Sequence, residues 1–352
     1  MSAAPPLTVL GLVEHWADRM EAAGLSQTDG FGQGTLTAFD EAAWLVLWCL
    51  GLPLDELDEV ENTPVAPADA EKIAILLEAR INTRRPAAYL TKEAWLQGVP
   101  FYVDERVIIP RSLIAELLVD ESIDPWLSEP SAAPGRPKQA GAPEGLEPAA
   151  PNLPAQVGTG DRGEASREPR PARPRAAHEV ASVGAQSFRV LDLCTGNGSL
   201  AILAAMAYPD VQVDAADISL EALAVARINV DIHELQARIT LMESDGLAAC
   251  PGPYDLILCN PPYVNAVRMA ALPAEFRAEP ALALAGGQDG MDFIRSLFLN
   301  AARHMSENAV LVLEIGNERE NFERAFPELE PLWFETSAGP DQVLLLTRQQ
   351  LA

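Results

Sequence analysis

The stretch Tyr254-Asp255-Leu256-Ile257-Leu258-Cys259-Asn260-Pro261-Pro262-Tyr263 decides the fold of this chain. Its apolar first half predicts a buried strand. Two consecutive prolines then end the strand, because proline donates no backbone N–H and fixes φ at about −65°. The Asn260 carboxamide and the Pro261 carbonyl are thereby left free at the carboxyl end of a strand, which is where open α/β sheets bind ligands. Two acceptors beside the Tyr263 ring suit a flat, neutral group that carries an NH2.

Apolar runs and helical patterns alternate on both sides of this stretch. Continuous apolar strands separated by helices indicate a parallel sheet that is buried on both faces. The last two runs flank Ser337-Ala338-Gly339-Pro340, and they predict an antiparallel pair that closes the sheet. The strands are expected at 188–193, 211–216, 238–242, 254–259, 308–315, 331–336 and 341–347, and the helices at 199–207, 219–230 and 291–304.

The rest of the chain divides by composition. Apolar residues recur at helical spacing through 1–90, which predicts a helical domain there. Short strand-like pieces within 91–127 predict a hairpin and a hinge. Proline, alanine, glycine and arginine dominate 128–185, so this segment is expected to be a disordered insert. The α/β domain is expected at 186–352.

The composition and net charge of the chain exclude some classes of function and favour others. The net charge of −26 argues against stable nucleic-acid binding, which depends on Lys and Arg, and favours a basic protein partner. Acidity that only keeps the protein soluble is an equally good explanation. No apolar run reaches the roughly 20 residues of a membrane span, and no signal peptide is recognisable. The four cysteines and four histidines are scattered, so we expect a cytoplasmic protein without a metal site.

A second motif, Asp192-Leu193-Cys194-Thr195-Gly196-Asn197-Gly198, ends the first expected strand of the α/β domain. Its glycines permit a tight turn close to a ligand, and Asp217 ends the next strand, where an acid can accept both ribose hydroxyls. The glycine spacing also fits a dinucleotide, whose pyrophosphate needs a helix N-terminus. Acids at successive strand ends favour a positively charged sulfonium cofactor such as S-adenosylmethionine instead; they are Asp192, Asp217 and Asp245. Asp192 and Asp245 could also merely cap turns.

The two motifs together suggest methyl transfer to a planar nitrogen. The lone pair of an amide or a base amine is delocalised, so the NH2 protons must be drawn to fixed acceptors before the nitrogen can attack. Asn260 and the Pro261 carbonyl can accept those protons while the Tyr263 ring packs on the planar group. The rate gain would come from positioning and preorganised dipoles.

Outside 128–185, the chain resembles the protein-(glutamine-N(5)) methyltransferases over nearly its whole length. The resemblance implies a class I S-adenosylmethionine-dependent domain with a seven-stranded sheet, behind a helical substrate-recognition domain. It also implies methylation of a glutamine side-chain amide. The motifs that carry it are Phe31-Gly-x-Gly34, Asp40-Glu-Ala42, Arg85-Pro-Ala-Ala-Tyr89, Ile109-Pro-Arg-Ser112, Asp192-Leu-Cys-Thr-Gly196, Asn260-Pro-Pro-Tyr-Val264, Leu272-Pro-Ala-Glu-Phe276 and Asp289-Gly-Met-Asp292.

Two motifs distinguish the branches of this family. Release-factor methyltransferases typically carry Pro-Arg-Pro-x-Thr-Glu at the hinge and glycine where Cys194 stands, whereas this chain has Pro110-Arg-Ser-Leu-Ile-Ala-Glu116. The resemblance is therefore to the ribosomal branch, which acts on the third large-subunit ribosomal protein. It implies that Asn260, Pro261 and Tyr263 are catalytic and that Asn260, Pro261, Pro262, Tyr263 and Arg111 bind substrate. The implied cofactor-binding residues are Asp192, Thr195, Gly196, Asn197, Gly198, Asp217, Asp245 and Asn260.

Three alternatives remain open at this point. The first is glutamine methylation of a peptide-chain release factor. The second is adenine N(6) methylation of nucleic acid, which would call for a basic cleft and a target-recognition domain. The third is a non-enzymatic assembly factor, for which loss of Asp217 or Asn260 would be expected, yet both are present.

Overall fold

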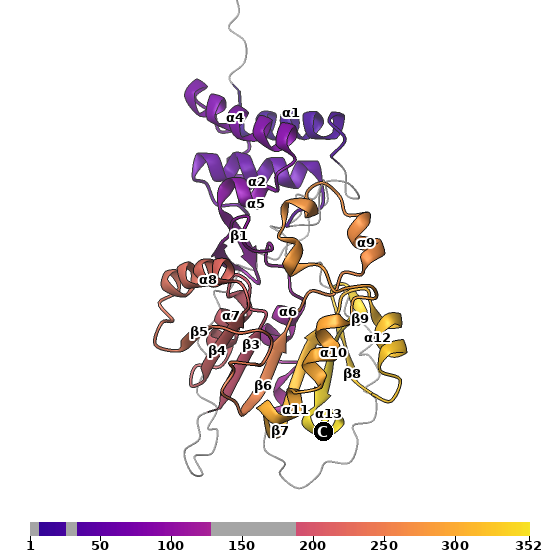
Figure 1. Ribbon diagram of the computed structural model, residues 1–352. Coiled ribbons are helices and arrows are strands. Elements are labelled where there is room, and N and C mark those ends of the chain that lie inside the picture. Colours follow the sequence, from indigo (N-terminus) through magenta and orange to yellow (C-terminus); the bar gives the residue numbers. More distant parts are fainter. Residues whose placement is uncertain (1–6, 26–33, 128–187) are drawn as a thin grey trace, which may run out of the picture. The chain divides into compact units, whose positions relative to one another are not determined.

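The computed structural model describes residues 7–25, 34–127 and 188–352 (Figure 1). The chain forms two compact units, and the first contains the described residues 7–25, 34–111 and 271–281. The second contains 112–127, 188–270 and 282–352. The insert expected at 128–185 lies outside the described residues, and the domain limits expected from sequence stay predictions.

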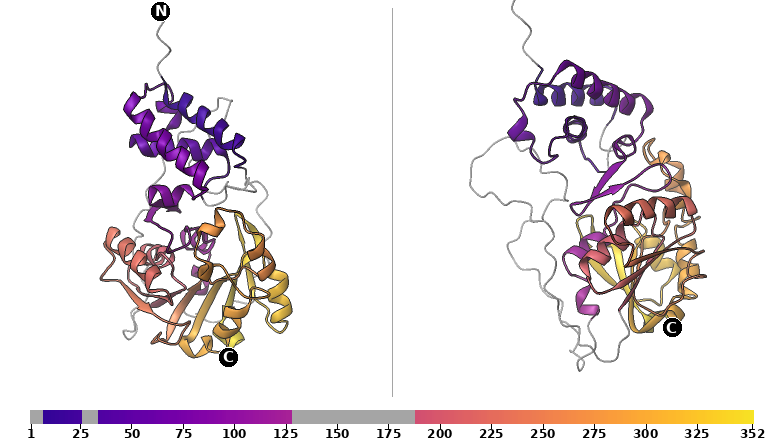
Figure 2. Two further views of the ribbon diagram at one scale, coloured as in Figure 1. Left: turned by 45° about the horizontal axis from the view of Figure 1, so that its top comes forward. Right: turned by 90° about the vertical axis from the view of Figure 1, so that its left-hand side faces the viewer.

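The first unit is mainly helical, as Figure 2 shows. The first helix buries Val9, Leu12, Trp16 and Met20, which recur at the spacing of one helix face. Threonine caps the first two helices by accepting a backbone N–H, from Gly11 in one and Asp40 in the other. The helices are α1 (Val9–Ala22), α2 (Ala38–Leu50), α3 (Leu57–Val60), α4 (Pro67–Thr83), α5 (Ala87–Thr91) and the 3-10 turn η2 (Phe276–Ala278).

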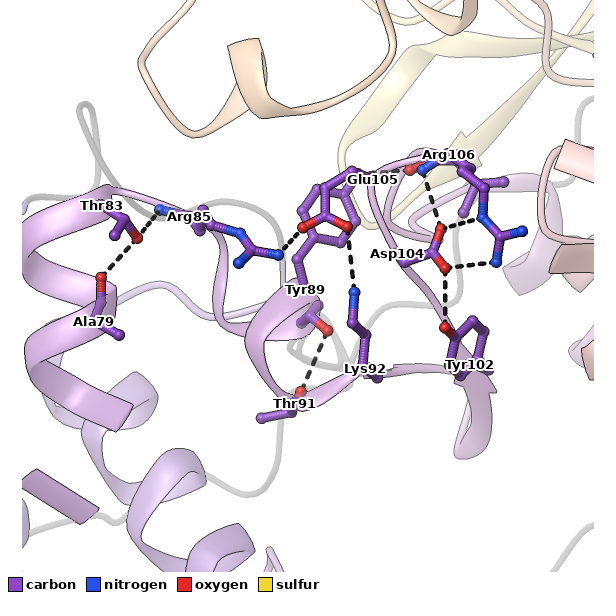
Figure 3. A network of polar contacts seen from close by, with 12 residues as sticks. Ala79, Thr83, Arg85, Tyr89, Thr91, Lys92, Tyr102, Asp104, Glu105 and Arg106 are labelled. Carbon is purple, nitrogen blue, oxygen red and sulfur yellow. Dashed lines mark hydrogen bonds and ion pairs between the residues drawn. The ribbon is translucent and has the colours of Figure 1, made fainter. Parts of the chain in front are cut away.

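The expected hairpin is confirmed in this unit. Strands β1 (Glu93–Leu96) and β2 (Val99–Tyr102) pair antiparallel around a two-residue turn with positive φ, which suits a tight hairpin. The chain that leaves the hairpin is held by Asp104, which accepts from Arg106 at 2.8 and 2.6 Å and from the Tyr102 hydroxyl at 2.9 Å (Figure 3). The Arg106 hydrogen bonds lower the pKa of Asp104 to about 2, so its carboxylate stays charged at neutral pH.

A buried ion network holds the 271–281 segment in the first unit. Arg80 is fully buried on α4; its guanidinium donates to Glu41 at 2.6 Å and to Glu275 at 3.2 Å. Arg84 donates to the same Glu275 oxygen at 2.6 Å. Burial raises the pKa of Glu41, against the attraction of Arg80. Removing one member of a buried pair leaves the other charge uncompensated, typically at a cost of about 3–5 kcal/mol, so loss of one of these side chains should destabilise the unit.

The second unit is built on a sheet whose described strands follow the order β5-β4-β3-β6-β7-β9-β8. Neighbours are parallel except at β9, which runs antiparallel to both β7 and β8. The strands are β3 (Arg189–Leu193), β4 (Gln212–Asp217), β5 (Ile239–Glu243), β6 (Tyr254–Cys259), β7 (Met305–Glu314), β8 (Leu332–Thr336) and β9 (Gly339–Thr347). The expected α/β sheet with a closing antiparallel pair is confirmed.

Helices cover this sheet on both faces. Alternate side chains such as Leu191, Ile257 and Leu311 pack with Ile294 of α10 and Phe322 of α12. The intervening strand residues are buried as well, and α6 and α7 contact the strands β7 and β3. Because successive side chains point to opposite faces, both sides of the sheet are core. The helices of this unit are α6 (Ile114–Val119), η1 (Asp124–Trp126), α7 (Ser199–Ala207), α8 (Leu220–Ile232), α9 (Ala266–Ala270), α10 (Asp292–Phe298), α11 (Ala301–His304), α12 (Arg319–Ala325) and α13 (Arg348–Leu351), with η3 (Ala281–Ala283) at the boundary.

One expected helix differs in the structure. The pattern at 291–304 predicts a continuous helix, but α10 ends at Phe298 and α11 begins at Ala301. Asn300 interrupts it with φ −126° and ψ −16°, since asparagine favours caps and turns over helix interiors. Strand β7 begins at Met305, directly after α11, rather than at 308. None of the described helices is long and apolar enough to span a membrane.

The strand order places a ligand site. β3 lies between β4 and β6 in the sheet. The chain runs from β3 through β4 to β5 on one side, and then returns to β6 on the other side of β3. At such a switch point, ligands bind beyond the carboxyl ends of the strands. The two sequence motifs, Asp192–Gly198 and Asn260–Tyr263, lie at the carboxyl ends of β3 and β6.

Candidate active site

Register aligns three strand ends at the switch point. Leu193 of β3 pairs with Cys259 of β6, and Cys259 pairs with Leu313 of β7. The next residue on each strand is therefore Cys194, Asn260 and Glu314. Since the three strands are parallel, these residues emerge at the same edge of the sheet.

The turn after β3 needs left-handed backbone at Cys194, Gly196 and Gly198, with φ of 63°, 56° and 83°. A side chain on Gly198 would press on Ala226 of α8, with a Cβ contact at 3.2 Å, so its glycine lets the two segments pack closely. A Cβ on Gly196 would meet no described atom within 4 Å. The turn is thus packed on one side and open at Gly196, where a ligand can approach the backbone.

Asp192 lies near the end of β3, just before the turn, and is buried. Its Oδ2 accepts from the Thr195 hydroxyl at 2.5 Å and from Ala201 N–H at 3.0 Å. Its Oδ1 is buried and has no hydrogen-bond partner among the residues that the structure describes. Burial raises the pKa of Asp192 to about 7. A buried acceptor with this need for a partner is suited to a positively charged ligand group.

Asp217 ends β4 and joins the turn to α8. One carboxylate oxygen accepts from Gly196 N–H and the other from Ser219 N–H, both at 2.9 Å. Burial raises the pKa of Asp217, partly offset by these bonds. A carboxylate has about four acceptor positions, so Asp217 retains capacity for two hydroxyl donors.

The other expected cofactor residues have different surroundings. The Thr195 hydroxyl is bonded to Asp192, so its observed role is to shape the turn. Asn197 is buried and accepts from Ser199 N–H at 3.2 Å, while its Nδ2 lacks a partner among the described residues. Asp245 is exposed, two residues beyond β5. Their cofactor contacts stay predictions.

Asn260, Pro261, Pro262 and Tyr263 follow β6 as expected. Asn260 is half-buried and Pro261 buried. Within the described chain, the Asn260 carboxamide and the Pro261 carbonyl have no hydrogen-bond partner. Both acceptors are therefore available to a ligand at the switch point.

Tyr263 is closely surrounded by glycine. A Cβ on Gly286 would lie 2.7 Å from Cα of Tyr263, and one on Gly290 would collide with its carbonyl oxygen. A Cβ on Gly316 would lie 2.5 Å from Cε2 of the ring. Three glycines from two separate loops thus fix both the backbone and the ring of this tyrosine.

Glu314 is a site residue that the sequence reasoning missed. It is buried at the end of β7, and its Oε1 accepts the Tyr263 hydroxyl at 3.3 Å. The signal was an acid closing the otherwise apolar run Val310-Leu-Val-Leu-Glu314, just before Gly316. An acid at the buried carboxyl end of a strand is rare unless it is paired, so its presence indicates that it holds a specific partner.

Cys194, which lies at this edge, is a poor nucleophile. A hydrogen bond with Cys259 and burial raise the pKa of the Cys194 thiol. An activated thiol requires a lowered pKa, so covalent catalysis by Cys194 finds no support.

Arg111 belongs to the first unit. It forms a two-point ion pair with buried Glu279, at 2.5 and 2.7 Å, and lies over the Phe276 ring. The structure therefore gives Arg111 a role in holding the 271–281 segment, which the sequence did not suggest. Its contact with substrate stays a prediction.

Comparison with known proteins shows the family to which the chain belongs. The Methyltransferase small domain matches residues 180–318. A protein of Bordetella pertussis named ribosomal protein uL3 glutamine methyltransferase is 43% identical, over 98% of this chain and 96% of its own length. The chain belongs to the uL3 glutamine methyltransferase family. Proteins of the same name from Burkholderia pseudomallei and Neisseria meningitidis are 42% and 40% identical, and each covers at least 98% of this chain.

The family membership confirms the class I methyltransferase fold, and S-adenosyl-L-methionine is the cofactor of this enzyme. The residues present fit that molecule. The partnerless Asp192 oxygen offers an acceptor to a positively charged group, and Asp217 offers spare acceptor positions to ribose hydroxyls. The open face at Gly196 leaves space for a ligand against the backbone.

Proposed function

We propose that this enzyme methylates the side-chain amide nitrogen of a glutamine on ribosomal protein uL3. The observation that carries the proposal is the pair of unpartnered acceptors, Asn260 and Pro261, fixed beside Tyr263 at the switch point of the sheet. Relatives that match this chain from end to end and bear the uL3 name support the choice of acceptor protein. Because the acceptor is a ribosomal protein, we expect the reaction in the cytoplasm.

The chemistry needs the glutamine nitrogen to expose its lone pair. Bound S-adenosyl-L-methionine supplies an electrophilic methyl group on a sulfonium. Asn260 Oδ1 and the Pro261 carbonyl accept the two amide protons, which turns the nitrogen out of conjugation and fixes its direction. The nitrogen that gains the methyl group becomes positively charged. It returns to neutrality by releasing one of these protons to solvent water, since the Asn260 and Pro261 oxygens are too weakly basic to keep it.

The residues around these two acceptors restrict the motion of the Tyr263 side chain and do not transfer protons. The glycines around Tyr263 hold its ring in one place, where it packs on the planar amide. These acceptors are dipoles already fixed before substrate binds, so little reorganisation is needed when charge develops. The net charge of −26 would also speed encounter with a basic protein, an effect that weakens as salt is raised.

The test is transfer of tritiated methyl groups to three purified acceptors: uL3, a peptide-chain release factor, and a mixture of tRNA and DNA. Label on uL3 alone supports the proposal. Label on the release factor would keep the chemistry and replace the acceptor. Label on nucleic acid would favour adenine methylation, and no label on any of the three would refute the proposal.

A further inference from the structure

Glu314 is the buried acid that the proposed chemistry leaves unused. Only 3% of its surface is exposed, and it leaves β7 level with Asn260 on β6. Burial raises the pKa of Glu314 against the hydrogen bonds that favour its charged form. A carboxyl group is costly to bury, so its contacts indicate what it is there to hold.

The two oxygens of Glu314 bind different segments. Oε2 accepts from the Ser112 hydroxyl at 2.6 Å and from Leu113 N–H at 2.9 Å. Oε1 accepts from the Tyr263 hydroxyl at 3.3 Å. Ser112 and Tyr263 are 151 residues apart in the sequence, and this one carboxylate joins them.

The Tyr263 ring is confined from another direction by Gly316, two residues beyond Glu314 on the same strand end. Glu314, which ends β7, therefore contacts the ring hydroxyl, and the segment at Gly316 lies close to the ring edge. A ring held at two points has a defined plane, whereas a ring held at one can pivot.

We propose that Glu314 is a positioning residue, which Ser112 orients and which fixes the Tyr263 ring against the substrate amide. The inference rests on the proposed function, in which that ring packs on the glutamine. A different account is that Glu314 only caps α6, since it accepts N–H groups at the start of that helix. That account predicts lost stability without a selective effect on turnover.

The experiment is a double-mutant cycle on the full-length enzyme with uL3 as acceptor. Ser112→Ala and Tyr263→Phe each remove one hydroxyl and keep Glu314, so the fold is spared the loss of a buried charge. Each should lower kcat about three- to tenfold, the range for one lost hydrogen bond, with the affinity for S-adenosylmethionine unchanged. If Ser112 acts through Tyr263, Ser112→Ala should have less than about a twofold further effect in the Tyr263→Phe enzyme.

Ser306→Ala is the matched control. Ser306 also donates to a carboxylate, Asp255 Oδ1 at 2.6 Å, but near the amino end of β7. This variant should keep wild-type kcat. Thermal unfolding of every variant checks that lost turnover is not lost fold.

The outcomes separate the two proposals. If the wild-type enzyme does not methylate uL3, the proposed function and this inference both fall. If the wild type is active but the two effects multiply, Ser112 and Tyr263 act independently and only this inference is overturned. Ser112→Ala with normal kcat and lowered stability would overturn it in favour of the helix cap.

Discussion

Replacing Gly316 with alanine tests whether the position of the Tyr263 ring limits turnover. The added Cβ would lie 2.5 Å from Cε2 and 3.0 Å from Cζ of the ring. Carbon atoms pack at about 3.5–4.0 Å, so the ring or its loop must move by about 1 Å. A misplacement of about 1 Å in a catalytic site can cost roughly 10²-fold in rate. We therefore expect kcat to fall about 10- to 100-fold.

The assay pairs steady-state methylation of uL3 with calorimetric binding of S-adenosylmethionine. Affinity for the cofactor should stay within about twofold of wild type, because Gly316 lies two residues beyond the end of β7 and not in the turn after β3. Alanine at φ +51° also strains the backbone, at a cost of about 1–2 kcal/mol.

Gly51→Ala is the control for that strain. Gly51 has φ +65°, and a Cβ placed there meets no described atom within 4 Å. It should lose similar stability and keep wild-type kcat. A folded Gly316→Ala enzyme with normal kcat would refute the idea that the ring must be held in place. An equal loss of cofactor affinity would show that the shift reaches the cofactor turn instead.

Three further predictions concern the other site residues. Asn260→Ala should abolish turnover and leave most of the cofactor affinity; equal loss of both in calorimetry would mean that its role is misplaced. Asp217→Asn should weaken cofactor binding by about 1–3 kcal/mol, the cost of unpairing buried polar groups, and unchanged affinity would argue against ribose binding. Burial raises the pKa of Asp192 to about 7, so its contribution to folding is full below about pH 4 and is lost as pH rises through about 7. In the cofactor-free enzyme, the unfolding free energy of Asp192→Asn relative to wild type should therefore rise by about 2 kcal/mol between about pH 5.5 and pH 8.5, whereas a constant difference in urea titrations would contradict the shifted pKa.

Much of the fold could be predicted from local patterns in the sequence. Apolar runs ended by glycine, proline or acid residues predicted the parallel strands. The strand-like pieces within 91–127 predicted the hairpin, whose observed turn lies at Gln97-Gly98. The proline pair after Cys259 marked the site because its effect on the backbone is local. The break at Asn300 was missed because one poor helix former is a weak signal within an apolar pattern.

Contacts between residues far apart in the sequence could not be predicted from such local patterns. Glu314 meets Ser112 across 202 residues, and Arg80 meets Glu275 across 195 residues. Nothing in the composition of either segment specifies its partner, because a buried charge can be satisfied by any donor that the fold brings near. The sequence contains the glycines that surround Tyr263, but it does not show that they lie close to this residue, because that contact depends on how the loops fold.

The most direct measurement of the central claim is peptide mass spectrometry of uL3 after incubation with the enzyme and S-adenosylmethionine. Our account predicts one added methyl group on a glutamine side-chain nitrogen, absent when that glutamine is replaced by alanine and absent with the Asn260→Ala enzyme. A methyl group on a lysine, on the backbone or on any other side chain would contradict it.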